Sequence, residues 1–481
     1  MGVVDCVICP VCGSLCDDIK LTVEGNTIVK VKNACAMGEA KFLNYNQDRP
    51  PAPMIRKDGK LIKASWEEAI QRSAEILTKA SYPILYGWSS TSCEAIKKGL
   101  ELAEEVGGVI DNTSTVCHGP SILGIQDIGL SSCTLGQIRH RADLVVYWGS
   151  NPWAAHPRHI ERYTMFTDGR FRDSTWERYA SHSSIGQMRK RFQRVSEITH
   201  GRMMPRPVKM ENQMPSALFQ KGRKMIVVDS RRTRSADAAD FFLQVKPNSD
   251  YEILQALRML VRNEELDLGE VAGIPVDLLE EIADAMIRCE VGVIFFGLGL
   301  TMSLGKHRNI DAALSLVRDL NRRTKFLIMP MRGHFNVTGA NAVFLWQTGY
   351  PFAVDFSKGY PQYNPGETSA VDILSRGDSD AGLVISSDPV SNFPKAAVES
   401  LVKNPLIVID PIETPTSLMA DVVLPSTFVG IETEGTAYRM DHVPLPLKKV
   451  VDPPGHRFSD EEILHRIIVN VRRQNHKHTR G

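Results

Sequence analysis

The residues with the most distinctive chemistry are the cysteines near the N-terminus. Cys9, Cys12 and Cys16 follow the spacing C-x2-C-x3-C, and Cys35 comes after a predicted hairpin over 21–31. Four thiolates from one short segment are the ligand set of an iron–sulfur cluster. A structural zinc site usually takes its ligands from two paired arms, so zinc is the less favoured interpretation.

Cys6 leaves the identity of the fourth ligand open. The run from Cys6 to Cys16 also has the spacing of ferredoxin ligands, although Asp17 stands where that run carries proline. Either Cys6 or Cys35 is therefore spare. Three other cysteines stand in apolar or helical settings and are predicted to be small buried core residues: Cys93, Cys133 and Cys289.

A second candidate is Cys117, which His118 follows directly. The polar stretch 111–115 predicts a loop before it, and a helical run begins near Ser121. The dipole and free N–H groups where a helix starts favour the thiolate, which binds soft metals or attacks carbon. His118 could move protons at about neutral pH. Because most Cys-His pairs are structural, this pair gains weight only from the motifs around it.

The third candidate is the segment 331–339, which reads Met-Arg-Gly-His-Phe-Asn-Val-Thr-Gly. It follows a predicted strand and carries polar groups where packing residues would be expected. Arg332 presents a planar guanidinium that can clamp a carboxylate or an oxygen of CO2.

The elements that must position these groups alternate, beyond residue 50, between short apolar runs and helical stretches. This pattern predicts an α/β fold with doubly wound parallel sheets, covered by helices on both faces. Ligands bind at the carboxyl ends of such strands. The predicted strands begin at Ile84, Leu144, Met225, Val291, Phe326, Leu383, Leu406 and Val422.

The residue types at the ends of these strands form an internal repeat, with three matching pairs in the same order along the chain. Repeated apolar strands ending in Gly, Asn or Asp occur in any doubly wound fold. The shared order and the proline positions nevertheless favour two halves of the chain with the same nucleotide-binding arrangement. Such ends offer N–H groups to phosphate and an Asp to a ribose or base edge, which predicts two dinucleotide-like ligands. The pairs are 86–88 with 296–298, 149–152 with 386–389, and Asp229 and Thr233 with Asp410 and Thr414.

Length and charge narrow the class of protein. At roughly 150 residues per domain, 481 residues predict about three domains. The 57 Lys and Arg balance 56 Asp and Glu, so no net field draws the chain to nucleic acid or an acidic membrane. The longest apolar stretch, 291–300, is about half of the ~20 residues that cross a bilayer, and no signal peptide is recognisable. We therefore expect a cytoplasmic protein. Residues from about 165 to 222 carry excess Lys and Arg and predict an insertion that faces solvent or a partner subunit.

Together these motifs resemble the molybdopterin oxidoreductase family, which includes dimethyl sulfoxide reductase and formate dehydrogenases, and within it the formylmethanofuran dehydrogenases. The resemblance implies a small N-terminal iron–sulfur domain and two doubly wound domains related by a pseudo-two-fold, without the C-terminal β-barrel domain of longer relatives. The expected domains are 1–49 for the cluster, 50–115 plus 333–455 and 116–332 for the pterin dinucleotides, and 456–481 for a C-terminal helix and tail. The motifs that carry the resemblance are Cys9/Cys12/Cys16/Cys35, 117–119, 149–152, Asp229, 332–339, Asp410, 420–425 and 434–436.

The resemblance also implies the site. Cys117 would ligate tungsten or molybdenum together with two molybdopterin guanine dinucleotides, and His118 and Arg332 would be catalytic. One 4Fe-4S cluster would be held by Cys9, Cys12, Cys16 and Cys35. The implied cofactor-binding residues are Gly149, Ser150, Asn151, Asp229, Thr233, Gly297, Gly299, His334, Ser387, Asp388, Asp410 and Thr414.

The implied activity is the reversible two-electron reduction of CO2 to formate in methanogenesis. Formate would pass to an amidohydrolase-like partner subunit for condensation with methanofuran, and a barrel-domain subunit and a polyferredoxin-type donor would complete the complex. A stand-alone formate dehydrogenase, another bis-pterin oxidoreductase and a non-catalytic electron-wiring subunit are the alternatives. Cysteine and dithiolene ligands suit tungsten and molybdenum alike. Many relatives carry a Lys or Arg soon after the fourth cluster cysteine, whereas Met37 stands here and Lys41 could substitute only if the backbone turns.

Overall fold

The computed structural model describes residues 2–167 and 222–478, so the predicted basic insertion lies almost wholly outside the described residues. The chain forms two compact units, one made of Met1–Ile122 with Arg332–Gly481 and the other of Leu123–Met331. The cysteine-rich segment thus belongs to the first unit, and the crossover to the second falls a few residues later than predicted. Within the described ranges, no helix is long and apolar enough to cross a membrane.

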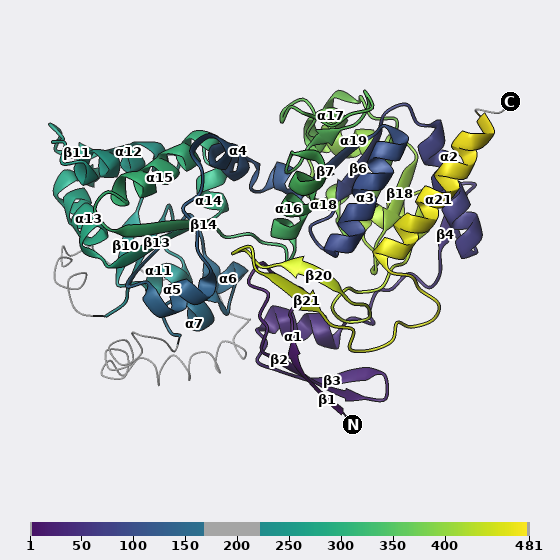
Figure 1. Cartoon of the computed structure of the whole chain (residues 1–481), viewed down its shortest axis with the longest axis horizontal. Coiled ribbons are helices and arrows are strands. Elements are labelled where there is room, and N and C mark those ends of the chain that lie inside the picture. Colours follow the sequence, from purple (N-terminus) through teal and green to yellow (C-terminus); the bar gives the residue numbers. More distant parts are fainter. Residues whose placement is uncertain (1, 168–221, 479–481) are drawn as a thin grey trace. The chain divides into compact units, whose positions relative to one another are not determined.

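The N-terminal segment of the first unit is a three-stranded antiparallel sheet followed by one helix (Figure 1). Its elements are β1 (Gly2–Val7), β2 (Ile19–Glu24), β3 (Thr27–Lys32) and α1 (Ala36–Leu43). The predicted hairpin is confirmed as β2 and β3, with Gly25 at a φ of +59° in the turn. The loop between β1 and β2 carries three of the four cysteines, and Cys35 stands at the N-cap of α1.

The large sheet of the first unit has nine strands in the order β16-β15-β7-β6-β17-β18-β19-β4-β5. Its five central strands are parallel, and the pairs at both edges are antiparallel. Because β6 is followed in the chain by β7 on one side and later by β17 on the other, the topological switch point lies between β6 and β17. The strands are β4 (Met54–Lys57), β5 (Lys60–Lys63), β6 (Pro83–Gly87), β7 (Val109–Asn112), β15 (Val354–Asp355), β16 (Gln362–Tyr363), β17 (Ala381–Ile385), β18 (Leu406–Ile409) and β19 (Val422–Leu424).

Helices cover both faces of this sheet, and alternate residues of each strand supply the two cores. Leu383 and Ile385 of β17 pack with α2, α3, α16 and α21, whereas Val384 packs with α17 and α19. Burial on both faces explains why these strands read as continuous apolar runs. The remaining elements are α2 (Trp66–Lys79), α3 (Cys93–Val106), η1 (Thr113–Val116), α4 (Gly119–Ile128), α16 (Val337–Thr348), α17 (Ala370–Arg376), α18 (Pro389–Asn392), α19 (Lys395–Lys403), α20 (Pro415–Met419), β20 (Gly435–Tyr438), β21 (Pro444–Leu447) and α21 (Asp460–His478).

The second unit has a five-stranded parallel sheet in the order β10-β9-β8-β13-β14, with its switch point between β8 and β13. Helices α12, α13 and α15 bury one face against Val146, Ile226 and Ile294. The elements are α5 (Leu135–Arg141), β8 (Leu144–Trp148), α6 (Pro152–Ala155), α7 (His159–Tyr163), β9 (Lys224–Asp229), α11 (Arg234–Asp237), β10 (Phe241–Gln244), α12 (Asp250–Val261), β11 (Glu270–Val271), β12 (Ile274–Pro275), α13 (Val276–Arg288), β13 (Val291–Phe296), α14 (Leu298–Thr301), α15 (His307–Leu320) and β14 (Lys325–Pro330).

The α/β class and all eight predicted strands are confirmed. The predicted polar loop over 111–115 is wrong, because Asp111 and Asn112 end β7 and are fully buried. The carboxylate of Asp111 accepts hydrogen bonds from the backbone N–H groups of Asn112, Ala353 and Ala370, although burial still raises its pKa to about 7. The prediction of three buried core cysteines is also too strong, since each is only partly buried: Cys93, Cys133 and Cys289.

Candidate functional site

Four cysteines of the N-terminal segment lie close together. Burial raises the pKa of the Cys9 thiol, and the neighbouring charges of Cys16, Cys12 and Cys35 raise it further. A Cβ added at Gly38 of α1 would lie 3.1 Å from Cys9 Sγ and 3.9 Å from Cys35 Sγ, so only glycine leaves this space open. Cys6 is exposed on β1 and is not among the charges that act on Cys9.

The donor chemistry of this four-cysteine site fits an iron–sulfur cluster. Four thiols gathered in one mostly buried place are costly as anions unless a cation binds them. Among the described residues, no group of three or more His, Cys, Asp or Glu is close enough together to bind one metal ion. A cluster of four irons takes one thiolate on each iron, so it needs a wider set of ligands than zinc does.

Cys117 and Arg332 both belong to the first unit, and they lie near enough for the charge of each to act on the other. Cys117 lies between η1 and α4, where burial raises the pKa of its thiol to about 11 and the charge of Arg332 lowers it only partly. Burial therefore works against the thiolate that the start of a helix was expected to favour. A bound metal cation would deprotonate such a thiol outright. Burial likewise lowers the pKa of Arg332 to about 10, opposed by Cys117.

Arg332 is held by a residue that the sequence analysis missed. Its Nη1 donates to Asn341 Oδ1, and Asn341 Nδ2 donates to Ser114 Oγ at 2.9 Å and to Pro351 O at 3.0 Å. Asn341 is a buried polar residue in the apolar helix α16, and that contrast was the available signal. His118 is fully buried, and its Nδ1 lies 3.0 Å from Ser121 Oγ, which fixes the orientation of the ring.

The strand end that carries Arg332 pairs with the cysteine loop. Cys12 and His334 form an antiparallel bridge, and Gly13 N donates to Gly333 O at 3.3 Å. A Cβ at Gly13 would lie 2.5 Å from Arg332 O, so this approach requires glycine. The two candidate sites of the first unit are thus joined through backbone contacts, and His334 takes part through its main chain.

A cavity of about 300 Å³ opens at the switch point between β6 and β17. It is lined by four predicted cofactor-binding residues that come from different strand ends: Ser387, Asp388, Asp410 and Thr414. Burial raises the pKa of Asp410 to about 7, although Ile412 N donates to its carboxylate at 3.0 Å. Pro10 and Val11 of the cysteine loop also line the cavity, so the four-cysteine site and the cavity share a wall.

Lys41 lies between these two features. It is in α1, lines the cavity and senses the charges of Asp410 and Cys9, while burial lowers its pKa to about 8. Because Met37 and Lys41 both lie in α1, the helix carries Lys41 to the cavity while Met37 is exposed. That Lys41 takes the place of the basic residue of many relatives stays a prediction.

In the second unit, Gly149, Gly297 and Gly299 meet at the switch point between β8 and β13. A Cβ at Gly297 would lie 2.6 Å from Gly149 O, and one at Gly299 would lie 2.7 Å from Gly149 Cα. Gly299 N donates to Gly149 O at 2.9 Å. Close contact between two loops, rather than open space for a ligand, is therefore the immediate reason for these glycines.

The polar residues at the neighbouring strand ends of this unit have local partners as well. Asn151 Oδ1 accepts from Ser235 Oγ at 2.7 Å, and Ser150 is buried. Asp229 accepts from Arg231 N at 3.1 Å, and Thr233 caps α11 by accepting from Ala236 N at 3.3 Å. These contacts order the strand ends on which the predicted cofactor-binding residues stand.

The internal repeat of the sequence is matched by a repeat in backbone conformation. Gly149 and Ser386 both have a positive φ, of 55° and 46°, at the ends of β8 and β17. Pro152 and Pro389 then begin the four-residue helices α6 and α18. The ends of β9 and β18 match as well. In each, an Asp accepts a hydrogen bond from the backbone N–H two residues later, and a Thr caps the next helix: Asp229 and Thr233 after β9, and Asp410 and Thr414 after β18.

Gly299→Ala is expected to destabilise the second unit by about 1–3 kcal/mol, because its Cβ would meet backbone atoms that cannot move independently. Urea unfolding of the full chain measures this loss. Gly269→Ala in the same unit is the matched control, since nothing lies within 4 Å of its Cβ. Equal stability of both variants would contradict the close contact.

Comparisons with known proteins agree with this architecture. Residues 49–469 match the family model of the molybdopterin oxidoreductases. The chain is 46% identical to the B subunit of the tungsten-containing formylmethanofuran dehydrogenase 2 of Methanocaldococcus jannaschii, over 97% of this chain and 98% of the relative. Identity to the Methanococcus maripaludis protein of the same description is 42%, with the same coverage. The formyltransferase/hydrolase complex FhcABCD from Methylorubrum extorquens contains a chain with the same fold, at a TM-score of 0.64 and 19% identity, covering 88% of this chain and 99% of that one.

Proposed function

Because the chain belongs to the molybdopterin oxidoreductase family, we propose that it is the B subunit of a formylmethanofuran dehydrogenase, an enzyme that reversibly reduces CO2 to formate. The observation that carries this proposal is a partly buried cysteine, Cys117, whose charge and that of the buried Arg332 act on each other, in a chain nearly half identical to such subunits.

The residues present fit the cofactors that the family implies. Cys117 would ligate tungsten or molybdenum, and the polar strand ends at the two switch points would hold two molybdopterin guanine dinucleotides. Ser387, Asp388 and Asp410 would act in the first unit, and the loops that begin at Gly149 and Gly297 in the second. Cys9, Cys12, Cys16 and Cys35 would hold a 4Fe-4S cluster. When bound, the metal and its pterins supply the two-electron change.

The chain's own side chains bind and orient the substrate. Reduction of CO2 takes up two electrons and one proton, so the site must hold a neutral molecule that becomes an anion. Arg332 lies within reach of the charge of Cys117 and would hold the oxygens of CO2 or formate, with Asn341 fixing the guanidinium. His118, oriented by Ser121, would hold or move the proton. Burial of both residues excludes water from these contacts.

The same proposal assigns the expected partners. Formate would leave for an amidohydrolase-like subunit that condenses it with methanofuran. Electrons would arrive singly from a ferredoxin-type subunit. A further subunit with a barrel domain would complete the complex, which we place in the cytoplasm.

Elemental analysis with nucleotide extraction tests the proposal on anaerobically purified native complex. We expect about four irons, about one tungsten or molybdenum and about two guanine nucleotides per chain, beyond the metals of any partner subunit. Iron without tungsten, molybdenum or guanine would instead indicate an electron-wiring subunit. Zinc alone would overturn the cluster assignment.

Arg332→Lys is expected to raise the KM for formate roughly tenfold or more, because an ammonium cannot copy the charge-assisted fork of a guanidinium. Steady-state kinetics of formate oxidation on the assembled enzyme measure the change. Arg258→Lys is the control, since Arg258 is paired with Asp319 in the second unit. An unchanged KM in the Arg332 variant would remove Arg332 from substrate binding.

A further inference from the structure

Lys41 presents an unusual charge that is only partly exposed. It reaches the cavity from α1, yet its ammonium forms no hydrogen bond or ion pair with any residue in the part of the chain that the structure describes. Its nearest partner is an aromatic face, since Nζ lies 3.9 Å from the centroid of the Phe428 ring. A cation is attracted to the negative face of an aromatic ring, and more strongly where water is excluded, so this contact is a substantial part of what holds Lys41.

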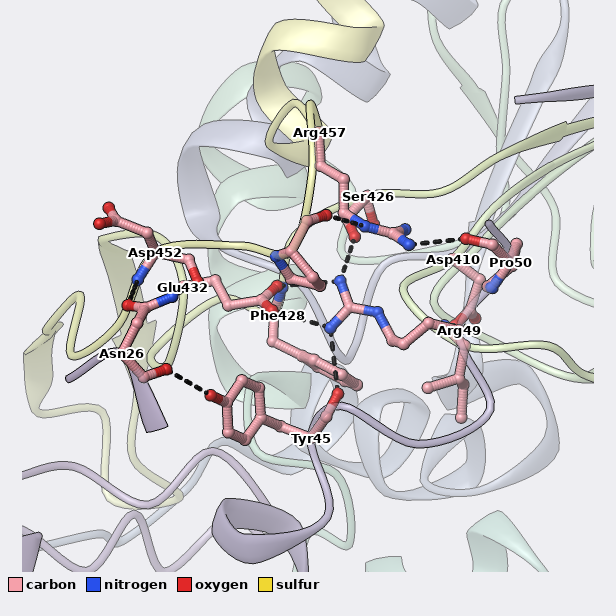
Figure 2. A network of polar contacts seen from close by, with 12 residues as sticks. Asn26, Tyr45, Arg49, Pro50, Asp410, Ser426, Phe428, Glu432, Asp452 and Arg457 are labelled. Atoms are coloured by element: carbon pink, nitrogen blue, oxygen red, sulfur yellow. Dashed lines mark hydrogen bonds and ion pairs between the residues drawn. The ribbon is translucent and has the colours of Figure 1, made fainter. Parts of the chain in front are cut away.

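Phe428 is itself fixed by a buried ion pair. Arg49 binds both carboxylate oxygens of Glu432, at 2.9 and 3.0 Å, and Glu432 also accepts from Phe428 N at 2.8 Å. The two side chains are 5% and 0% exposed, and Arg49 Cζ lies 4.8 Å from the Phe428 centroid. Figure 2 shows the guanidinium of Arg49 meeting Glu432, Ser426 and Tyr45 beside the Phe428 ring. The ring therefore has little freedom to move.

The position of the ring connects the two candidate sites of the first unit. Phe428 packs in the same apolar cluster as Cys9 and Cys16, and it also lines the cavity with Asp410. The rigid ring of Phe428 keeps Lys41 at the boundary between the four-cysteine site and the cavity. Asp410 is the strongest charge acting on Lys41, and Cys9 acts on it as well.

We propose that Phe428 is a positioning residue whose ring, fixed by the Arg49–Glu432 pair, holds the Lys41 ammonium between the four-cysteine site and the cavity. The inference rests on the proposed function, because that function places an iron–sulfur cluster on the cysteines. Reduction adds one electron to the cluster, and a cation kept nearby stabilises the reduced form. Phe428 therefore raises the midpoint potential of the cluster through Lys41.

The test is the midpoint potential of the cluster, followed by electron paramagnetic resonance in a redox titration of the assembled enzyme. Phe428→Leu is expected to shift the potential to a more negative value, whereas Phe428→Tyr keeps the ring and the wild-type potential. Phe428→Met fills a similar volume and replaces the leucine variant if that one does not accumulate. Phe242→Leu is the matched control, because Arg232 Cζ lies 5.7 Å from the centroid of the Phe242 ring, in the second unit.

A double-mutant cycle separates positioning from packing. In a Lys41→Met background, Phe428→Leu is expected to shift the potential no further. An unchanged potential in Phe428→Leu, or the same shift with and without Lys41, would overturn the inference and leave the proposed function intact. A cluster without tungsten or molybdenum would overturn the proposed function alone. Absence of any cluster signal in the wild type would overturn both.

Discussion

Cys117→Ala is expected to abolish formate oxidation and CO2 reduction while the iron–sulfur signal remains. The reason is that Cys117 is the proposed metal ligand and lies within reach of the charge of Arg332, whereas the four-cysteine site is built from a separate loop and α1. Loss of the proposed ligand would remove the reaction centre, so turnover should fall to background. The measurement is formate-dependent reduction of a dye by the anaerobically purified complex, with the resonance signal of the cluster recorded on the same sample.

Cys289→Ala provides the control for this variant. Cys289 also has a pKa raised by burial, to about 12, but its thiol donates to Met286 O in the second unit. Removing it should cost packing and leave turnover at the wild-type level. Wild-type turnover in Cys117→Ala would contradict the ligand assignment, and joint loss of turnover and cluster signal would show that the substitution damages the whole first unit.

The sequence predicted the sheets well, because strands buried on both faces must be apolar throughout. Every run that begins at a predicted position, such as Ile84 or Val291, became a parallel strand, and a Gly, Ser, Asp or Pro either ends the strand or follows it directly. Candidate residues at those ends followed directly, since the carboxyl ends of parallel strands share one edge. The positions of Asp388 and Asp410 around one cavity needed only this rule.

Three features were missed when the sequence was interpreted. Asp111 looked like a loop residue because nothing local reveals that Ala353 and Ala370, far along the chain, donate to its carboxylate. The sequence suggested a thiolate at Cys117, but burial raises the pKa of this thiol, and burial depends on the whole fold. Asn341 was missed because its partner Arg332 is nine residues away, across the start of a helix.

Cysteine spacing left open whether Cys6 or Cys35 is the fourth ligand of the proposed cluster, and the tertiary structure favours Cys35. Cys6 and Cys35 fit the two alternative patterns equally, and only the tertiary fold separates them. Cys35 contributes to the charges around Cys9 because α1 folds back over the loop, whereas Cys6 lies exposed on β1, at a φ of 54°. Assignment of Cys35 as the fourth ligand stays a prediction, to be tested by the iron content of a Cys35→Ser variant beside Cys6→Ser.

Glu432→Ala is expected to lower the free energy of unfolding by about 3–5 kcal/mol, because it leaves the Arg49 guanidinium buried without its counter-charge. The structural change should be confined to the contacts around Arg49. Arg49 donates to Tyr45 O and Ser426 O, so the pair joins the end of the N-terminal segment to the loop that carries Phe428 (Figure 2). Urea unfolding of the anaerobically purified full chain gives the magnitude, and iron content reports on the four-cysteine site.

Glu462→Ala is the matched control, since Glu462 pairs with Arg466 on the exposed side of α21, where the two side chains are 41% and 45% exposed. Exposed pairs contribute about 0–1 kcal/mol, so this variant should unfold close to the wild type. Replacing both partners, in Arg49→Met with Glu432→Leu, should recover much of the stability lost in Glu432→Ala, because no charge is then left buried. A loss below about 1 kcal/mol in Glu432→Ala would mean that water reaches Arg49. The Phe428 ring would then lack the rigid support on which the placement of Lys41 depends.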